Sequence, residues 1–115
     1  MHEGSITQAM LNLALKHAER HHATRIVRIN LAIGEVSGIV DIHVQLYFDF
    51  LSKGTIAEGA HLSFRTVPAT GRCRNCGREF ELQGLACDWV CPVCGGTQVQ
   101  IIGGNRLYLE SIEVE

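Results

Sequence analysis

Four of the five cysteines form two copies of one short motif, Cys-x-x-Cys-Gly, and these residues are well suited to metal chemistry. Two thiolates separated by two residues can bind one ion from a tight turn, and two such turns complete a tetrahedral four-sulfur site. Residues 77–90 separate the two Cys-x-x-Cys pairs, and this spacing is typical of a zinc ribbon. The sequence therefore predicts a zinc site formed by Cys73, Cys76, Cys91 and Cys94.

A closed shell of four sulfurs leaves no coordination position for a substrate, so the predicted zinc is structural and a zinc-dependent hydrolase is excluded. An iron site or a redox dithiol is the alternative for the same cysteines. The fifth cysteine, Cys87, lies between the pairs near Trp89. We interpret it as a small buried hydrophobic residue, with an exchangeable metal ligand or a redox-sensitive thiol as the alternatives.

The first three residues, Met1-His2-Glu3, form a second candidate metal site. The α-amine, the amide nitrogen of His2 and the His2 imidazole can close fused chelate rings around one ion, and a donor from Glu3 completes a planar set. Planar, nitrogen-rich geometry suits Ni(II) or Cu(II), whereas zinc prefers a tetrahedron. The alternative is a solvated histidine, because the motif by itself carries little information.

Composition and charge limit the other classes of function. The chain has 10 basic and 12 acidic residues and a formal net charge of −2, so it lacks the basic footprint of a nucleic-acid-binding protein. No apolar run approaches the roughly 20 residues of a membrane span. We recognise no signal peptide and expect a cytoplasmic protein with reduced thiols. No Ser-His-Asp arrangement, paired carboxylates or phosphate-binding glycine loop indicates an enzyme.

Helical spacing of apolar residues predicts a first helix over residues 4–22, and alternation predicts a half-buried strand over residues 24–34. The apolar face of the helix is expected to contain Ile6, Met10, Leu13, Ala14 and Ala18. The buried face of the strand is expected to contain Val27, Ile29, Leu31 and Ile33.

A second helix is predicted after a glycine-containing loop over residues 34–40, with Asp41 as its N-cap and Gly54 at its C-terminal end. Its expected apolar face consists of Val44, Tyr47, Phe48 and Leu51. Further strands are predicted over residues 62–66, 99–102 and 107–114. The apolar phase of the last strand slips after Leu109, which indicates a bulge or a frayed end.

These elements predict an α+β fold: a small mixed three-stranded sheet with two helices, plus an inserted zinc-ribbon module. We expect residues 1–70 to form the α+β domain, which the strand at residues 105–115 completes. Residues 71–104 are expected to form the zinc-binding module, whose few apolar residues make it dependent on the metal for folding.

Several short motifs occur along the chain in one order. They are Met-His-Glu before a helix, Ile33-Gly34-Glu35-Val36-Ser37-Gly38, Lys53-Gly54-Thr55, Ala57-Glu58-Gly59-Ala60, the paired Cys-x-x-Cys, and Ser111-Ile112-Glu113-Val114. With this combination the chain resembles the HypA/HybF family of hydrogenase nickel-incorporation proteins over nearly its whole length. The resemblance implies a nickel metallochaperone, and not an enzyme, that helps to insert Ni(II) into [NiFe]-hydrogenase during maturation.

The resemblance also implies ligands and partners. It maps nickel binding onto Met1, His2 and Glu3, in the first domain, and the zinc site onto the four cysteines. Asp41 lies near the place of an acidic ligand that some members use, whereas a histidine that others recruit near the last strand is missing, since no histidine follows His61. The implied partners are a HypB-type GTPase and the large subunit of [NiFe]-hydrogenase, without nucleic acid or membrane. We expect a monomer or a weak homodimer.

The competing interpretation is a zinc-ribbon adaptor or regulatory protein with no nickel role, in which the N-terminal histidine is incidental. The other histidines are interpreted as surface or strand-edge residues in both cases. They are His17, His21 and His22 on or just after the first helix, and His43 and His61 further along the chain.

Overall fold

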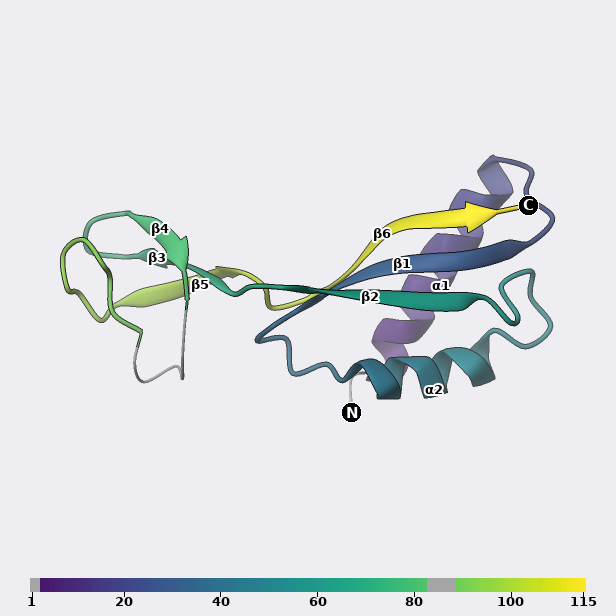
Figure 1. Cartoon of the computed structure of the whole chain (residues 1–115), viewed down its shortest axis with the longest axis horizontal. Coiled ribbons are helices and arrows are strands. Elements are labelled where there is room, and N and C mark those ends of the chain that lie inside the picture. The colour runs from purple at the N-terminus through teal and green to yellow at the C-terminus, as the bar shows by residue number, and fades with distance from the viewer. Residues whose placement is uncertain (1–2, 83–88) are drawn as a thin grey trace.

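The computed structural model describes residues 3–82 and 89–115, which form an elongated molecule of 53 × 27 × 17 Å with two lobes (Figure 1). The elements in chain order are α1 (Glu3–Arg20), β1 (Ile26–Gly34), α2 (Asp41–Leu51), β2 (His61–Val67), β3 (Thr70–Cys73), β4 (Glu79–Glu81), β5 (Val99–Gly103) and β6 (Leu107–Val114). The larger lobe contains both helices and one three-stranded sheet, and the smaller lobe contains a second three-stranded sheet. The predicted α+β class is therefore confirmed.

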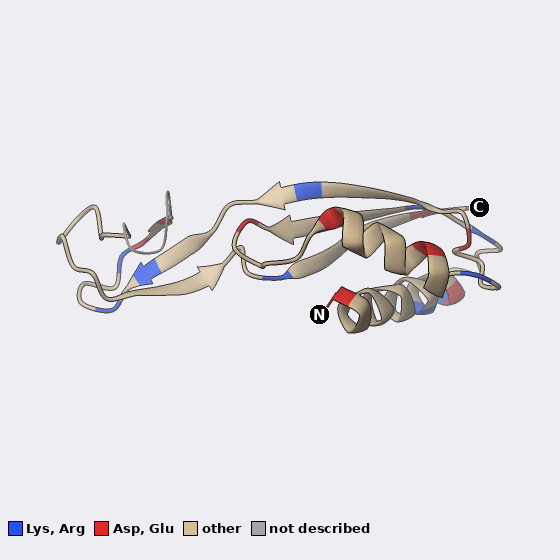
Figure 2. Cartoon of the chain, turned by 90° about the horizontal axis from the view of Figure 1, so that it is seen from below, with Lys and Arg blue, Asp and Glu red and all other residues tan. Residues whose placement is uncertain are grey.

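The sheet of the larger lobe has the strand order β2-β1-β6, with β1 parallel to β2 and antiparallel to β6. The sheet is thus mixed, as predicted, because α2 and its flanking loops connect the two parallel strands. Both helices cover the same face of this sheet (Figure 2). Lys and Arg are scattered over both lobes. The core between helices and sheet is built from these fully buried side chains among others: Leu11, Ala14, Ile29, Leu31, Val44 and Phe48.

Helix α1 packs through a face that agrees in part with the predicted one, since Met10, Ala14 and Ala18 are buried as predicted. Leu11 is 1% exposed and Thr7 is fully buried, whereas Leu13 is 45% exposed and Ile6 is only partly buried. The buried face is thus shifted around the helix axis towards Leu11 and Thr7. Ile6 and Leu13 therefore lie at the edge of the interface.

The end of α1 is a Schellman motif, which explains why the helix stops at Arg20 and not at residue 22. The N–H of Ala23 donates to the carbonyl of Ala18 (3.0 Å), and the N–H of His22 donates to that of Glu19 (3.0 Å). His22 adopts the left-handed conformation, with φ of 55°, that this motif requires.

Two β-bulges set which side chains of the sheet face the helices. In β1 the register shifts between Ile26 and Arg28, so Ile26 is fully buried while Val27 is 38% exposed. The expectation that Val27 is buried is wrong, because the bulge reverses the alternation at that point. In β6 the register shifts at Glu110, so Leu109 and Ile112, three residues apart, both pack against the core. The bulge predicted in the last strand is confirmed.

Helix α2 begins at Asp41, but Val40 is its N-cap and no side chain caps it, so the predicted N-cap is wrong by one residue. Asp41 instead accepts a hydrogen bond from the N–H of the next residue, Ile42 (2.7 Å). Val44 and Phe48 are buried as predicted, whereas Tyr47 is 45% exposed because it lies beside the first turn of α1 rather than over the sheet.

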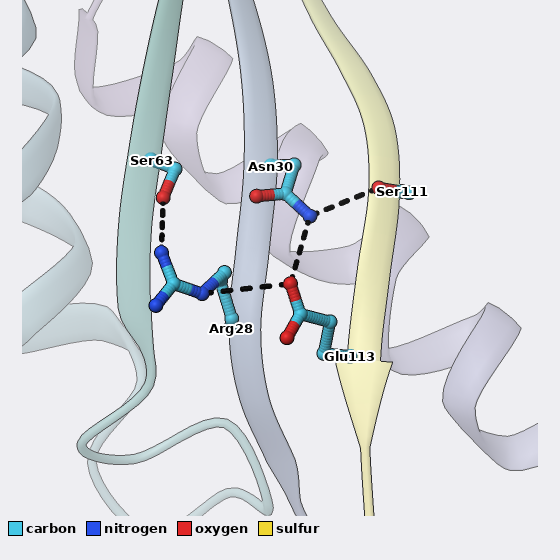
Figure 3. Close-up of polar contacts among 5 residues, drawn as sticks. All are labelled: Arg28, Asn30, Ser63, Ser111 and Glu113. Atoms are coloured by element: carbon cyan, nitrogen blue, oxygen red, sulfur yellow. Dashed lines mark hydrogen bonds and ion pairs between the residues drawn. The ribbon is translucent and has the colours of Figure 1, made fainter.

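The face of the sheet that the helices leave open carries a ladder of polar side chains across all three strands (Figure 3). Arg28 of β1 donates to Ser63 of β2 (2.7 Å) and forms an ion pair with Glu113 of β6 (3.5 Å). Asn30 donates to Ser111 (3.0 Å) and to Glu113 (3.3 Å). These contacts link the strands laterally and match a solvated sheet face.

The smaller lobe has the strand order β4-β3-β5, and all of its pairings are antiparallel. Two chain crossings connect it to the larger lobe, between β2 and β3 and between β5 and β6. At this joint the N–H of Val36 donates to the carbonyl of Gly104 (2.9 Å) and the N–H of Gly34 to that of Arg106 (2.8 Å). Among the described residues, no helix has the length and apolar character to cross a membrane.

Candidate metal centres

The four predicted zinc ligands come together in the smaller lobe. Their sulfur atoms all lie within 4.8 Å of one another, with 3.5 Å between Cys73 and Cys94 and 3.5 Å between Cys76 and Cys91. In a tetrahedral zinc site with Zn–S bonds of about 2.3 Å, the sulfurs lie about 3.8 Å apart. The observed spacing therefore fits a four-sulfur site that closes around one ion.

The two Cys-x-x-Cys-Gly turns have the same backbone hydrogen bonds. In the first, Gly77 donates to the carbonyl of Cys73 (2.8 Å), and in the second Gly95 donates to that of Cys91 (2.9 Å). Both glycines have positive φ, 81° and 74°, because the chain must turn back beneath the sulfurs. The repeated motif thus encodes two copies of one local structure, each of which presents two sulfurs on the same side.

Backbone N–H groups inside each turn favour the thiolate form that binds metal. The N–H of Cys76 is the main cause that lowers the pKa of Cys73, and the N–H of Cys94 lowers the pKa of Cys91 in the same way. The N–H of Arg78 also favours the thiolate of Cys76, but hydrogen bonding with the Cys91 sulfur, together with desolvation, outweighs it and raises the pKa of Cys76 to about 11. A bound dication would stabilise all four thiolates together, since thiols that coordinate a metal are deprotonated outright.

The burial of the ligands also fits a structural site. Cys73 is fully buried and Cys91 is 2% exposed, while Cys76 and Cys94 lie at the surface. Gly96 approaches the site so closely that a Cβ there would lie 3.2 Å from the Cys94 sulfur. Cys87, the fifth cysteine, lies outside the described residues, so its interpretation stays a prediction.

At the other candidate site, Met1 and His2 lie outside the described residues, and Glu3 is the first residue that the structure places. Glu3 begins α1 and is 9% exposed, in keeping with the favourable position of an acidic side chain in the first turn of a helix. Its carbonyl accepts a hydrogen bond from the hydroxyl of Thr7 (2.5 Å). The residue that follows His2 in the chain is therefore held against the larger lobe.

Helix α2 brings one unexpected side chain to Glu3. The Nδ1 atom of His43 lies 3.7 Å from the Oε2 atom of Glu3, and both residues line an open pocket of about 610 Å³. The rest of the lining consists of Leu46, Tyr47 and Phe50. Sequence reasoning assigned His43 to the surface only. Its side chain is indeed 53% exposed, but no local pattern indicated that α1 and α2 would pack with these two residues adjacent.

Asp41, which was predicted as a nickel ligand and begins α2, lies in a different place. It lines a separate pocket together with Gly34, Glu35 and Thr66, among others. In the described part of the chain, the four cysteines are the only group of three or more ligand side chains close enough to hold one ion. The role of Asp41 as a nickel ligand therefore stays a prediction.

Comparison with known proteins gives a consistent result. Residues 1–114 match the family model described as "Hydrogenase/urease nickel incorporation, metallochaperone, hypA". The chain belongs to the HypA family. It is 46% identical to the hydrogenase maturation factor HypA of Dehalococcoides mccartyi strain 195, over all of this chain and 95% of that protein. It is 41% identical to HypA of Caldanaerobacter subterraneus subsp. tengcongensis, over the full length of both.

The solved HypA structures share the whole fold with this chain. The solution structure of the Ni metallochaperone HypA from Helicobacter pylori matches with a TM-score of 0.79 at 26% identity, and covers 99% of this chain and 97% of its own. A second HypA solution structure matches with a TM-score of 0.79 at 27% identity. HypA membership confirms the resemblance inferred from the ordered motifs, and it places the chain among nickel metallochaperones of hydrogenase maturation.

Proposed function

We propose that this chain is a nickel carrier that binds Ni(II) at its N-terminus and delivers it to [NiFe]-hydrogenase during maturation. The observation that carries the proposal is the match to the nickel-incorporation family from residue 1 to residue 114, a range that contains both Met1-His2-Glu3 and the four cysteines. The chain would act by binding and release and would catalyse no reaction itself.

The nickel donors in this proposal are the α-amine of Met1, the amide nitrogen and imidazole of His2, and a donor from Glu3. Amine, amide and imidazole nitrogens separated by these short links close fused rings around a planar ion, a geometry that Ni(II) accepts and zinc disfavours. The burial of Glu3 at the start of α1 supports the proposal, because it holds one end of the chelate against the folded domain. A site at the end of a chain generally requires few packed contacts to break when its ion is released.

The metal of the four-cysteine site is zinc in this proposal, and its role is structural. The four sulfurs, all within 4.8 Å of one another, support a closed tetrahedral site, which suits zinc better than a metal with an exchangeable ligand. Because the smaller lobe has short strands and little buried apolar surface, zinc binding would supply much of the free energy that folds it. The nickel cargo and the structural zinc would thus occupy different lobes.

A carrier needs partners that load it or accept its cargo. We propose a HypB-type GTPase as the loading partner and the large subunit of [NiFe]-hydrogenase as the acceptor. The family description, which links this fold to hydrogenase maturation and nickel incorporation, supports this assignment. Nickel transfer would take place at the end of the larger lobe that carries Glu3.

Hydrogenase activity in a deletion strain tests the function as a whole. Loss of the gene is expected to abolish most hydrogenase activity in low-nickel medium, and excess nickel should restore part of it. Complementation with the wild-type chain should restore activity without added nickel, whereas His2→Ala should not. Normal maturation in the deletion strain at low nickel would contradict the proposal and favour an adaptor role for the zinc lobe.

A further inference from the structure

The contact between Glu3 and His43 has the spacing of two ligands that share one ion. Their Oε2 and Nδ1 atoms lie 3.7 Å apart, within the distance of an ion pair. Donor atoms that bind one ion through bonds of about 2.1 Å lie between about 3.0 Å apart, at 90°, and about 4.2 Å apart, at 180°. We propose that His43 is a nickel ligand, which adds its imidazole from α2 to the site at the chain end. This inference rests on the proposed nickel function.

Covalent geometry keeps the proposed chelate within reach of His43. Consecutive Cα atoms are about 3.8 Å apart, so any ion bound by the amide nitrogens of residues 2 and 3 lies within a few ångströms of the Glu3 backbone. The side chain of Glu3 is 12% exposed and lies beside the His43 ring. An ion that binds the Glu3 carboxylate would therefore lie beside an imidazole from the second helix.

The pocket around the two residues suits a ligand pair. Its other lining side chains, Leu46, Tyr47 and Phe50, supply no carboxylate or imidazole, so Glu3 and His43 are the candidate metal donors among them. The His43 side chain is 53% exposed, so the ion can enter and leave from solvent.

His43 is better placed for this role than Asp41. Residues two apart on a helix point in different directions, so Asp41 and His43 cannot both face Glu3. Asp41 binds the N–H of Ile42 and lines the pocket that contains Glu35, whereas His43 lines the pocket that contains Glu3. The second helix therefore contributes an imidazole to the site rather than the carboxylate that the sequence suggested.

The consequence is a site that links two helices. Without His43, all nickel donors come from the first three residues, and a planar four-donor site results. With His43, and with the Glu3 carboxylate beside it, the ion gains donors outside that plane and acquires a higher coordination number. Nickel would then connect the start of α1 to α2, and its ligand set would depend on how the two helices pack together.

X-ray absorption spectroscopy on nickel-loaded, full-length protein with Met1 as its first residue tests the inference. The probe is Ni(II) alone, and calorimetry on the same samples gives the affinity. We expect two imidazole ligands in the wild type and one in His43→Ala, with affinity reduced about tenfold or more. His17→Ala is the matched control, because His17 lies on α1 fourteen residues after Glu3, about 21 Å along the helix. It should leave both quantities unchanged.

The outcomes separate this inference from the proposed function. One imidazole in the wild type, with no change in affinity for His43→Ala, overturns the inference and leaves the nickel carrier intact. A wild-type chain that binds no nickel overturns both. With zinc bound and no nickel present, His43→Ala should have the same helical circular dichroism and the same melting temperature as the wild type, because the His43 side chain is exposed. A lower melting temperature there would instead assign His43 a structural role and count against ligation.

Discussion

Gly34, the last residue of β1, lies so close to the backbone of Gly104 that a Cβ on Gly34 would overlap the Gly104 carbonyl group. Gly104 is in turn packed against the backbone of Pro68 and Ala69, and it has a positive φ of 75°. These contacts are at the joint between the lobes, where Val36 also donates a hydrogen bond to Gly104. The close approach of backbone segments at this point fixes how the smaller lobe continues from the larger lobe.

Substitution of Gly34 tests the joint. Gly34→Ala should lower the free energy of unfolding by about 1–3 kcal/mol, because the neighbouring atoms are backbone and cannot move aside easily. Gly54→Ala is the control: Gly54 has φ of 80° but open space around its Cβ position, so it should cost only about 1–2 kcal/mol from backbone strain. Urea unfolding at fixed zinc content measures both. A Gly34→Ala variant as stable as the wild type would show that the joint is loosely packed.

Removal of one sulfur tests the zinc site. Cys73→Ser should abolish stoichiometric zinc binding and unfold the smaller lobe, because Cys73 is both a ligand and a buried part of β3. Most of the helical circular dichroism should remain, since both helices belong to the larger lobe. Metal analysis and circular dichroism check the two statements.

Cys87→Ser is the control for this variant and should keep about one zinc per chain. Zinc loss in Cys87→Ser, or full zinc retention in Cys73→Ser, would contradict the proposed ligand set.

The ion pair between Arg65 and Glu110 should make stability depend on pH. Arg65 donates two hydrogen bonds to the carboxylate (2.5 and 3.2 Å) and lowers the pKa of Glu110 below its ordinary value. A carboxyl whose pKa is lower in the folded state stabilises the fold above its unfolded pKa, and this contribution is lost as the pH falls through the folded pKa. The effect should be small, since the Arg65 side chain is 62% exposed.

Glu110→Gln should therefore be slightly less stable than the wild type near pH 7 and equally stable at pH 2. Denaturant midpoints over this range, with Arg65→Gln and the double variant to complete a cycle, provide the measurement. A constant difference between wild type and Glu110→Gln at all pH values would assign the stability change to packing at the bulge.

The parts of the fold that depend on local sequence were predictable. The two cysteine turns followed from a five-residue motif, and the bulge in β6 followed from the broken alternation after Leu109. The face of α1 was predictable only in part: Met10, Ala14 and Ala18 are buried as predicted, but Leu13 is as apolar as Leu11 and only Leu11 is buried. Helical periodicity by itself does not determine which of these apolar residues face the core.

The candidate nickel site also combines a local sequence motif with a contact that depends on tertiary packing. Met1-His2-Glu3 is a contiguous motif and was recognisable, whereas the position of His43 depends on how two helices separated by a strand pack together. Its proximity to Glu3 is a long-range relationship, and no spacing in the sequence encodes it. Asp41 was predicted as a ligand from its type and its place at the start of the second helix, and it lines a different pocket from Glu3 and His43, so its role as a ligand stays a prediction.

Nickel calorimetry on a chain with one residue added before Met1 tests whether the α-amine of Met1 binds nickel. The extension converts the α-amine into a peptide amide and moves His2 from the second position, so the fused rings cannot form in the same place. We predict that this variant loses nickel affinity to the same extent as His2→Ala, while the fold and the zinc content of both are unchanged, because neither alters the core or the cysteines. An extended chain that binds nickel as tightly as the chain that starts at Met1 would contradict the account, and the site would then have to be built from internal side chains.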